Sequence, residues 1–211
     1  MLSDKSFPVI EATLPLVGSR IGEITPKFYA RLFAAHPELL DGLFSRSNQR
    51  NGNQQQALAG SIAAFATHLV NNPGTLPETV LARIAHRHAS LGITEPQYQV
   101  VYEHLFAAIA EDLAEVITPE IAEAWTEVYW LMADALIKLE KGLYAAQANG
   151  TMWSPWKVAA KTPAGTGSIT FTLEPADEVP PGKGQAVVIV HGMGEQRPME
   201  TIRSFVQSAW S

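Results

Sequence analysis

The spacing of apolar residues constrains the fold more than any other feature, and it changes near residue 150. Up to about residue 148, apolar side chains recur every three or four positions, with few Gly or Pro inside the periodic stretches. This period is typical of amphipathic helices. Beyond residue 150, polar and apolar residues alternate among many Gly and Pro, as in strands and turns. We therefore expect an all-α domain followed by a short β or irregular extension.

Local motifs predict where the helices begin and end. A threonine can accept a hydrogen bond from an amide of the first turn, and a Glu or Gln three positions later completes a capping box. Proline is tolerated in the first turn, and glycine or proline ends a helix. The last helix, from about 119 to 147, is expected to be the longest. The predicted starts are Thr25 with Pro26, Asn53, Thr75 with Glu78, Thr94 with Gln97 and Thr118 with Pro119; the predicted stops are Pro37 and Gly92.

Composition limits the classes of function. Of the 211 residues, 15 are Lys or Arg and 21 are Asp or Glu, a formal charge of −6, which argues against nucleic acid or an anionic membrane as the main partner. The absence of cysteine excludes disulfides, thiolate metal sites and thiol catalysis. The sequence has neither a signal-peptide pattern nor an apolar run long enough to span a membrane. We expect a cytoplasmic protein with small-molecule partners.

Helical phase separates the two histidines of IAHRHASLG, residues 84–92. Residues four apart on a helix share a face, whereas residues two apart lie on opposite sides. His88 therefore shares an apolar face with Ile84 and Leu81, and His86 is expected to be solvated. His88 is either a core histidine bonded to a backbone carbonyl or a ligand to a cofactor.

Polar residues interrupt apolar stripes on the other helices. Glu140 lies where packing alone favours a hydrophobe, and a buried charge needs a partner. Tyr98 could reach both Glu140 and His88 if the helices pack together. Taken singly, each polar group could instead lie at a core edge with its tip in water. The stripes are Thr25, Tyr29, Leu32 and Phe33; Gln54, Leu58, Ile62, Phe65 and Leu69; Tyr98, Val101, Leu105, Ile109 and Leu113; and Trp125, Tyr129, Met132, Leu136, Glu140 and Leu143.

Four segments, in order and spacing, resemble the globin domain of bacterial flavohaemoglobins. They read FYARLF, PELLDGLFSRSNQRNGNQQQAL, RIAHRHASLGITEPQYQVVYEHL and AWTEVYWLMADALIKLEKGLY. The resemblance covers residues 1–148 and implies a globin fold around haem b. It implies that His88 is the proximal iron ligand. It further implies that Phe44 packs on the porphyrin, that Tyr29, Gln54 and Leu58 form the distal pocket, and that Tyr98 and Glu140 flank His88.

The resemblance also implies a chemistry. An acceptor behind His88 fixes its tautomer and makes it more basic, and a distal phenol and amide, Tyr29 and Gln54, can donate hydrogen bonds to bound dioxygen. In flavohaemoglobins the bound oxygen combines with nitric oxide to give nitrate and ferric haem. The iron must then be reduced.

The extension predicts no complete reductase. Residues 149–178 resemble the opening strands of the ferredoxin-reductase-type FAD barrel that follows the globin in flavohaemoglobins, and GTGSIT predicts a hairpin turn. We expect this start to be truncated. Neither an Arg-x-Tyr-Ser flavin motif nor a glycine-rich nucleotide loop occurs. FAD and NAD are therefore not expected in this chain, and electrons would come from a separate reductase.

Residues 179–211 contain AVVIVHGMGEQRPMETIRSFV, which resembles the first strand and HG loop of α/β-hydrolases. We do not expect an independent domain here. No G-x-S-x-G elbow occurs, and no acid and second histidine follow His191 in a triad order, so hydrolase catalysis is not expected. The tail would reflect a truncated or rearranged gene, or the start of a fusion.

The sequence is compatible with three functions. The first is a haem globin that binds dioxygen and nitric oxide and performs nitric oxide dioxygenation with an external reductase. The second is a non-catalytic gas-binding or sensing globin, and the third is part of a hydrolase fusion. The polar pocket favours the first, missing reductase motifs favour the second, and the absent serine elbow counts against the third.

Overall fold

Helices make up most of the part of the chain that the computed structural model describes, namely residues 1–41, 53–147, 155–165 and 168–176. The predicted all-α domain with a short β extension is therefore confirmed. The elements are α1 (Ser6–Ala35), the 3-10 helix η1 (Pro37–Asp41), α3 (Asn53–Asn71), α4 (Glu78–Leu91), α5 (Glu95–Asp112), α6 (Pro119–Ala145), β1 (Trp156–Gly165) and β2 (Ser168–Pro175).

The predicted boundaries at Thr94, Thr118 and Gly92 are confirmed. The amide of Thr94 donates to Gln97 Oε1 at 2.7 Å, which closes the capping box at the start of α5. Thr118 Oγ1 accepts from the amide of Ile121 at 3.3 Å, ahead of Pro119 at the start of α6. Gly92 ends α4 with a φ of 72°, in the left-handed region that glycine adopts without steric cost.

Three boundary predictions are wrong. Thr25 and Pro26 lie inside α1, where the buried Thr25 hydroxyl donates to the carbonyl of Ile21 at 2.7 Å. Ile24, Thr25 and Phe28 are all buried, and their packing in the core maintains the helix through Pro26. Thr75 caps nothing, because α4 begins only at Glu78. Finally α1, with 30 residues, is longer than α6, with 27.

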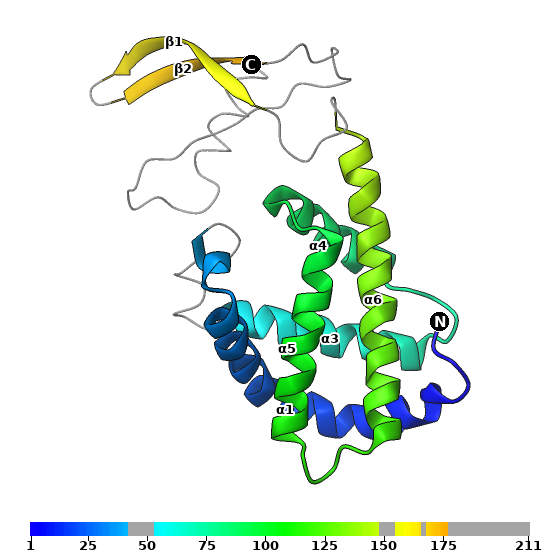
Figure 1. Ribbon diagram of the computed structural model, residues 1–211. Coiled ribbons are helices and arrows are strands. Elements are labelled where there is room, and N and C mark those ends of the chain that lie inside the picture. Colours follow the sequence, from blue (N-terminus) through cyan, green and yellow to red (C-terminus); the bar gives the residue numbers. More distant parts are fainter. Residues whose placement is uncertain (42–52, 148–154, 166–167, 177–211) are drawn as a thin grey trace.

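The helices cross around one apolar core. α1 packs against α3, α5 and α6, and α4 packs against α6. Figure 1 shows α5 and α6 side by side and running in opposite directions, with α4 near the start of α5. This arrangement places the end of α4, the beginning of α5 and the end of α6 together. The fully buried core includes Ile10, Ile24, Phe28, Leu32, Phe65, Leu81, Leu105, Ala108, Trp125, Val128 and Leu136.

Ion pairs join α1 to α5. The Asp112 carboxylate lies 2.9 Å from Arg20 Nε and 2.7 Å from Lys27 Nζ, and only 1 % of its side chain is exposed. The hydrogen bonds from Arg20 and Lys27 lower the pKa of Asp112 to about 2. A second pair joins Arg31, one turn after Lys27 on α1, to Glu111, the residue before Asp112 on α5. These contacts fix the register of two helices that lie far apart in the sequence.

β1 and β2 form an antiparallel hairpin in which Gly165 pairs with Ser168, so the predicted hairpin turn is confirmed. The large apolar side chains of the hairpin are about half exposed: Trp156, Val158, Ile169, Phe171 and Leu173. The predicted strand and HG loop after residue 179 lie outside the described residues. Among the helices that the structure describes, none is long and apolar enough to cross a membrane.

Candidate functional site

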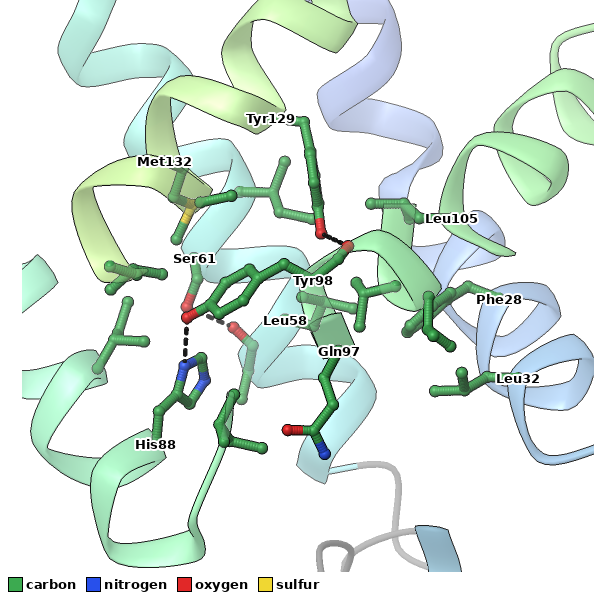
Figure 2. A pocket seen from close by; sticks show the side chains of 18 of the residues that line it. Phe28, Leu32, Leu58, Ser61, His88, Gln97, Tyr98, Leu105, Tyr129 and Met132 are labelled. Carbon is green, nitrogen blue, oxygen red and sulfur yellow. Dashed lines mark hydrogen bonds between the residues drawn. The ribbon is translucent and has the colours of Figure 1, made fainter. Parts of the chain in front are cut away.

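His88 lies in the last turn of α4 and faces two polar groups from other helices. Its Nδ1 is 2.9 Å from Glu140 Oε1 and 3.0 Å from Tyr98 Oη. Figure 2 shows its ring below Tyr98, with the contact drawn as a dashed line. His86 is exposed, as its helical phase predicts. The two histidines therefore occupy different environments, and the predicted meeting of Tyr98, Glu140 and His88 is present.

The link between α4 and α5 brings His88 and Tyr98 together. The amide of Ile93 donates to the carbonyl of His88 at 3.1 Å as the chain leaves α4. The Thr94 capping box then starts α5, and Tyr98 follows in its first turn. Local structure thus fixes two of the three polar groups. Glu140 comes from α6, 52 residues beyond His88, so its position depends on the packing of α6 against α4.

Glu140 is a buried carboxylate with partners that offset its desolvation. It is only 2 % exposed. The Tyr98 hydroxyl donates to Glu140 Oε1 at 2.6 Å, and His88 Nδ1 approaches the same oxygen. Burial, and then the hydrogen bond with Glu140, raise the pKa of Tyr98 far above its ordinary value, so the phenol remains a donor. A carboxylate can only accept hydrogen bonds, so this arrangement favours the proton on Nδ1 of His88.

The second nitrogen of His88 is therefore available as a ligand. With the proton on Nδ1, Nε2 carries a lone pair, and no described residue forms a hydrogen bond with it. An acceptor behind an imidazole raises its basicity and fixes the orientation of the ring. Such a histidine is suited to bind a metal centre through Nε2.

A large cavity of about 820 Å³ lies between the helices, and His88 lines it. Pockets for small molecules and cofactors range from roughly 300 to 1,000 Å³ and are mostly apolar. Figure 2 shows Leu58, Leu105 and Phe28 around it, with His88 and Gln97 at one side. The size and the mostly apolar lining of the cavity therefore suit a largely apolar cofactor. Its lining includes Phe28, Tyr29, Leu32, Leu58, Phe65, Val101, Leu105 and Met132.

Arg83 and Arg87 line the same cavity from α4. They are four residues apart, both are exposed, and neither has an ion pair with a described residue. Arginine can bind a carboxylate through two parallel hydrogen bonds. No role was predicted for these arginines from the sequence, although their i, i+4 spacing next to His88 could have pointed to them.

Of the other predicted pocket residues, Tyr29 and Leu58 line the cavity, whereas the Gln54 side chain and the whole of Phe44 are not among the described parts. Tyr29 is buried and Leu58 half-buried, and both line the cavity. The Tyr29 ring packs 4.7 Å from that of Phe28. The backbone of Gln54 lies in the first turn of α3, but its side chain is outside the described residues, and Phe44 lies wholly outside them.

Tyr129 and Tyr144 of α6 form hydrogen bonds with the backbone near the junction of α4 and α5. The Tyr129 hydroxyl donates to the carbonyl of Tyr98, and the Tyr144 hydroxyl donates to the carbonyl of Ile93, both at 2.6 Å. In the sequence, Tyr129 lies on the same apolar stripe as Glu140, but no role was predicted for it, and Tyr144 was not among the predicted site residues. Extending that stripe by one turn beyond Glu140 would have included Tyr144.

The surroundings of His88 limit how a metal could be held. Within residues 1–41, 53–147 and the hairpin, no cluster of three or more His, Asp or Glu could hold a metal ion. A metal at His88 would need most of its ligands from a cofactor. A model of the family Globin matches residues 26–136, more than half of the chain. The chain belongs to the globin family. Membership of this family implies haem as the cofactor and diatomic gases as ligands.

Individual relatives agree with this assignment. This globin is 41 % identical over 181 residues to a flavohemoprotein of Bordetella pertussis, a match that covers 84 % of this chain and 44 % of the relative. A crystal structure of a flavohemoglobin from Malassezia yamatoensis, with bound FAD and haem, matches with a TM-score of 0.77 and 51 % identity, over 88 % of this chain and 48 % of that one.

A bacterial globin from Campylobacter jejuni matches with a TM-score of 0.58 and 26 % identity, over 67 % of this globin and 99 % of its own length. The globin fold expected for the helical part is therefore confirmed. This globin spans about half the length of the curated relatives that it matches.

Proposed function

We propose that this globin binds haem through His88, takes dioxygen and nitric oxide as ligands, and supports nitric oxide dioxygenation when a separate reductase supplies electrons. The single observation that carries the proposal is the position of Glu140 Oε1, 2.9 Å from Nδ1 of His88. A buried acceptor at that nitrogen makes the imidazole a stronger electron donor through Nε2. This is the property that dioxygen activation requires of a proximal ligand, because it favours the oxidised state of the iron.

Haem, when bound, would supply an iron that takes diatomic gases and changes oxidation state. His88 would hold it from the α4 side of the cavity. The apolar residues Leu58, Leu105 and Phe65 would contact the porphyrin and exclude water. The exposed arginines, Arg83 and Arg87, would bind its carboxylates at the rim.

We assign the opposite side of the cavity to Tyr29, Gln54 and Leu58, with Phe44 against the porphyrin. A phenol and an amide donate hydrogen bonds that stabilise negative charge on a ligand oxygen. The burial of Tyr29 at the cavity wall supports this role, because a donor shielded from water acts more strongly.

We also propose a division of the chain into the globin at 1–148, the beginning of a flavin-binding barrel at 149–178, and an α/β-hydrolase-like strand and HG loop at 179–211. The half-exposed apolar face of the β1–β2 hairpin supports the second part, because an isolated two-stranded hairpin is at best marginally stable and such a face is normally covered by further strands. We assign no FAD or NAD site to these residues, since the sequence contains neither family motif.

A non-catalytic gas-binding or sensing globin is the second candidate. The same absence of flavin and nicotinamide motifs favours it, because a globin without a source of electrons binds its ligand but does not turn over. The two candidates share the haem site and differ only in their reaction with nitric oxide.

The test is to reconstitute the full chain with haem, reduce it, equilibrate it with air and mix it with nitric oxide in a stopped-flow instrument. A dioxygenase forms one nitrate per haem at each mixing. A flavin reductase titrated in with NADH should then sustain nitric oxide consumption in proportion to its concentration, whereas NADH alone should sustain it only slowly.

Each outcome distinguishes the candidates. Nitrate formation that becomes catalytic with the reductase supports the dioxygenase. Gas binding without nitrate supports the sensing globin. Rapid NADH oxidation by the chain alone would show that the assignment of no reductase site is wrong.

A further inference from the structure

The register of α6 against the α4–α5 corner controls the environment of His88. The corner comprises residues 88–98, and it is joined to α6 by an exposed ion pair, Lys141 with Glu95, and by four hydrogen bonds. Two end on Glu140, and they come from His88 and Tyr98. The other two come from phenols that do not touch His88, Tyr129 and Tyr144. Because these two phenols do not contact His88, a direct role at its ring does not explain their hydrogen bonds.

The two phenols bind backbone rather than side chains. Ile93 lies in the link between α4 and α5, and among the described backbone amides none donates to its carbonyl. The Tyr144 hydroxyl supplies that donor at 2.6 Å. The Tyr98 carbonyl lies in the first turn of α5 and receives the Tyr129 hydroxyl, also at 2.6 Å. The two bonds hold the corner at its link and at the residue that reaches Glu140.

Helical phase puts the three α6 side chains on one face. Tyr144 lies four residues after Glu140, and Tyr129 lies eleven before it, which is close to one turn and three turns. A small rotation or slide of α6 would therefore move all three contacts together. Burial raises the pKa of Tyr129 and of Tyr144, so both phenols stay protonated and remain donors.

We infer that Tyr129 and Tyr144 are positioning residues for the haem-ligating histidine: they clamp the α4–α5 corner to α6 in the register at which Glu140 and Tyr98 meet Nδ1 of His88. This inference rests on the proposed haem ligation by His88. Without the clamp, the corner moves relative to Glu140, the hydrogen bond to Nδ1 lengthens, and His88 becomes a weaker donor.

The test uses Tyr144→Phe and Tyr129→Phe in the full chain reconstituted with haem. The readout is the iron–histidine stretching frequency of the reduced protein by resonance Raman spectroscopy, which rises with the basicity of the ligand. We expect both variants to lower the frequency, in the direction of Glu140→Gln but by less. Tyr102→Phe is the matched control, because its hydroxyl also joins α5 to α6, through Thr126 Oγ1 at 3.2 Å, but away from the corner.

Amide hydrogen exchange gives a second readout that needs no haem. Loss of either phenol should speed exchange at residues 92–97 about fivefold, equivalent to about 1 kcal/mol for one hydrogen bond. Unchanged frequency and unchanged exchange in Tyr144→Phe would overturn the clamp, as would an equal frequency shift in Tyr102→Phe. If the wild-type chain binds no haem, the proposed function fails, and the exchange measurement still decides whether the clamp exists.

Discussion

His88 shows how much one side chain depends on its neighbours. Its Nδ1 meets Glu140 and Tyr98, while Nε2 has no partner among the described residues. The same contacts offset the desolvation of the buried Glu140 carboxylate and orient the His88 ring. The ability of His88 to bind a metal therefore depends on which of its two ring nitrogens, Nδ1 or Nε2, carries the proton.

His88→Ala should abolish haem ligation, whereas His86→Ala should leave it unchanged. The reason is that His88 lines the cavity, whereas His86 does not line it and is exposed on the other face of α4. The measurement is the absorption spectrum of the reduced, haem-reconstituted variants with and without added imidazole. Normal iron coordination in His88→Ala would show that another residue is the ligand.

Among the elements, α5 has the most completely capped start. Thr94 and Gln97 close a capping box directly before Tyr98, so the cap stabilises the helix that delivers this phenol to Glu140. Thr75 matches the same sequence pattern, with Glu78 three residues later, but caps nothing, because the chain starts α4 after Pro77. The same motif therefore has different consequences at two helix starts.

Thr94→Ala should lower the free energy of unfolding by about 1 kcal/mol, the typical value of an N-cap. Thr75→Ala is the matched control and should cost less than about 0.5 kcal/mol, because its exposed hydroxyl bonds only to Asn72 and His68. Urea titration followed by circular dichroism measures both. Equal losses in the two variants would refute the difference between the caps.

For the whole molecule, the contacts that join α1 to α5 are electrostatic as well as apolar. Asp112 lies 92 residues after Arg20 and 85 after Lys27, yet bonds both. Its pKa falls from 3.8 to about 2 because these cations stabilise the charged form. The stabilisation is therefore complete above pH 3.8 and is lost as the pH falls toward 2, since protonation removes the pair.

Asp112→Asn should destabilise the protein at pH 7 by about 1 to 2 kcal/mol, a value reduced by the partial exposure of both cations. The difference in the free energy of unfolding between the variant and the wild type should become smaller as the pH falls from about 4 to about 2. Urea unfolding at pH 7, 4 and 2.5 measures this. A difference that is constant with pH would mean that the carboxylate charge contributes nothing.

The sequence by itself determined the features that depend on neighbours within one or two turns: the helical period, the Thr94 cap, the Gly92 stop and the opposite faces of His86 and His88. It also determined the hairpin. These follow from local geometry, and the structure confirms them. Local pattern failed at Thr25 and Pro26, where burial in the core keeps α1 continuous through a motif that normally begins a helix.

The sequence predicted that Tyr98 and Glu140 would meet His88, but only the tertiary structure decided how α6 is held against them. The hydrogen bonds that reach the corner from Glu140, Tyr129 and Tyr144 join residues 31 to 52 positions apart. Their formation depends on the angle and register at which α6 packs against α4 and α5. That packing is a sum of many weak apolar contacts along whole helices, so no short segment encodes it, and the clamp on the corner becomes visible only when the helices are placed together.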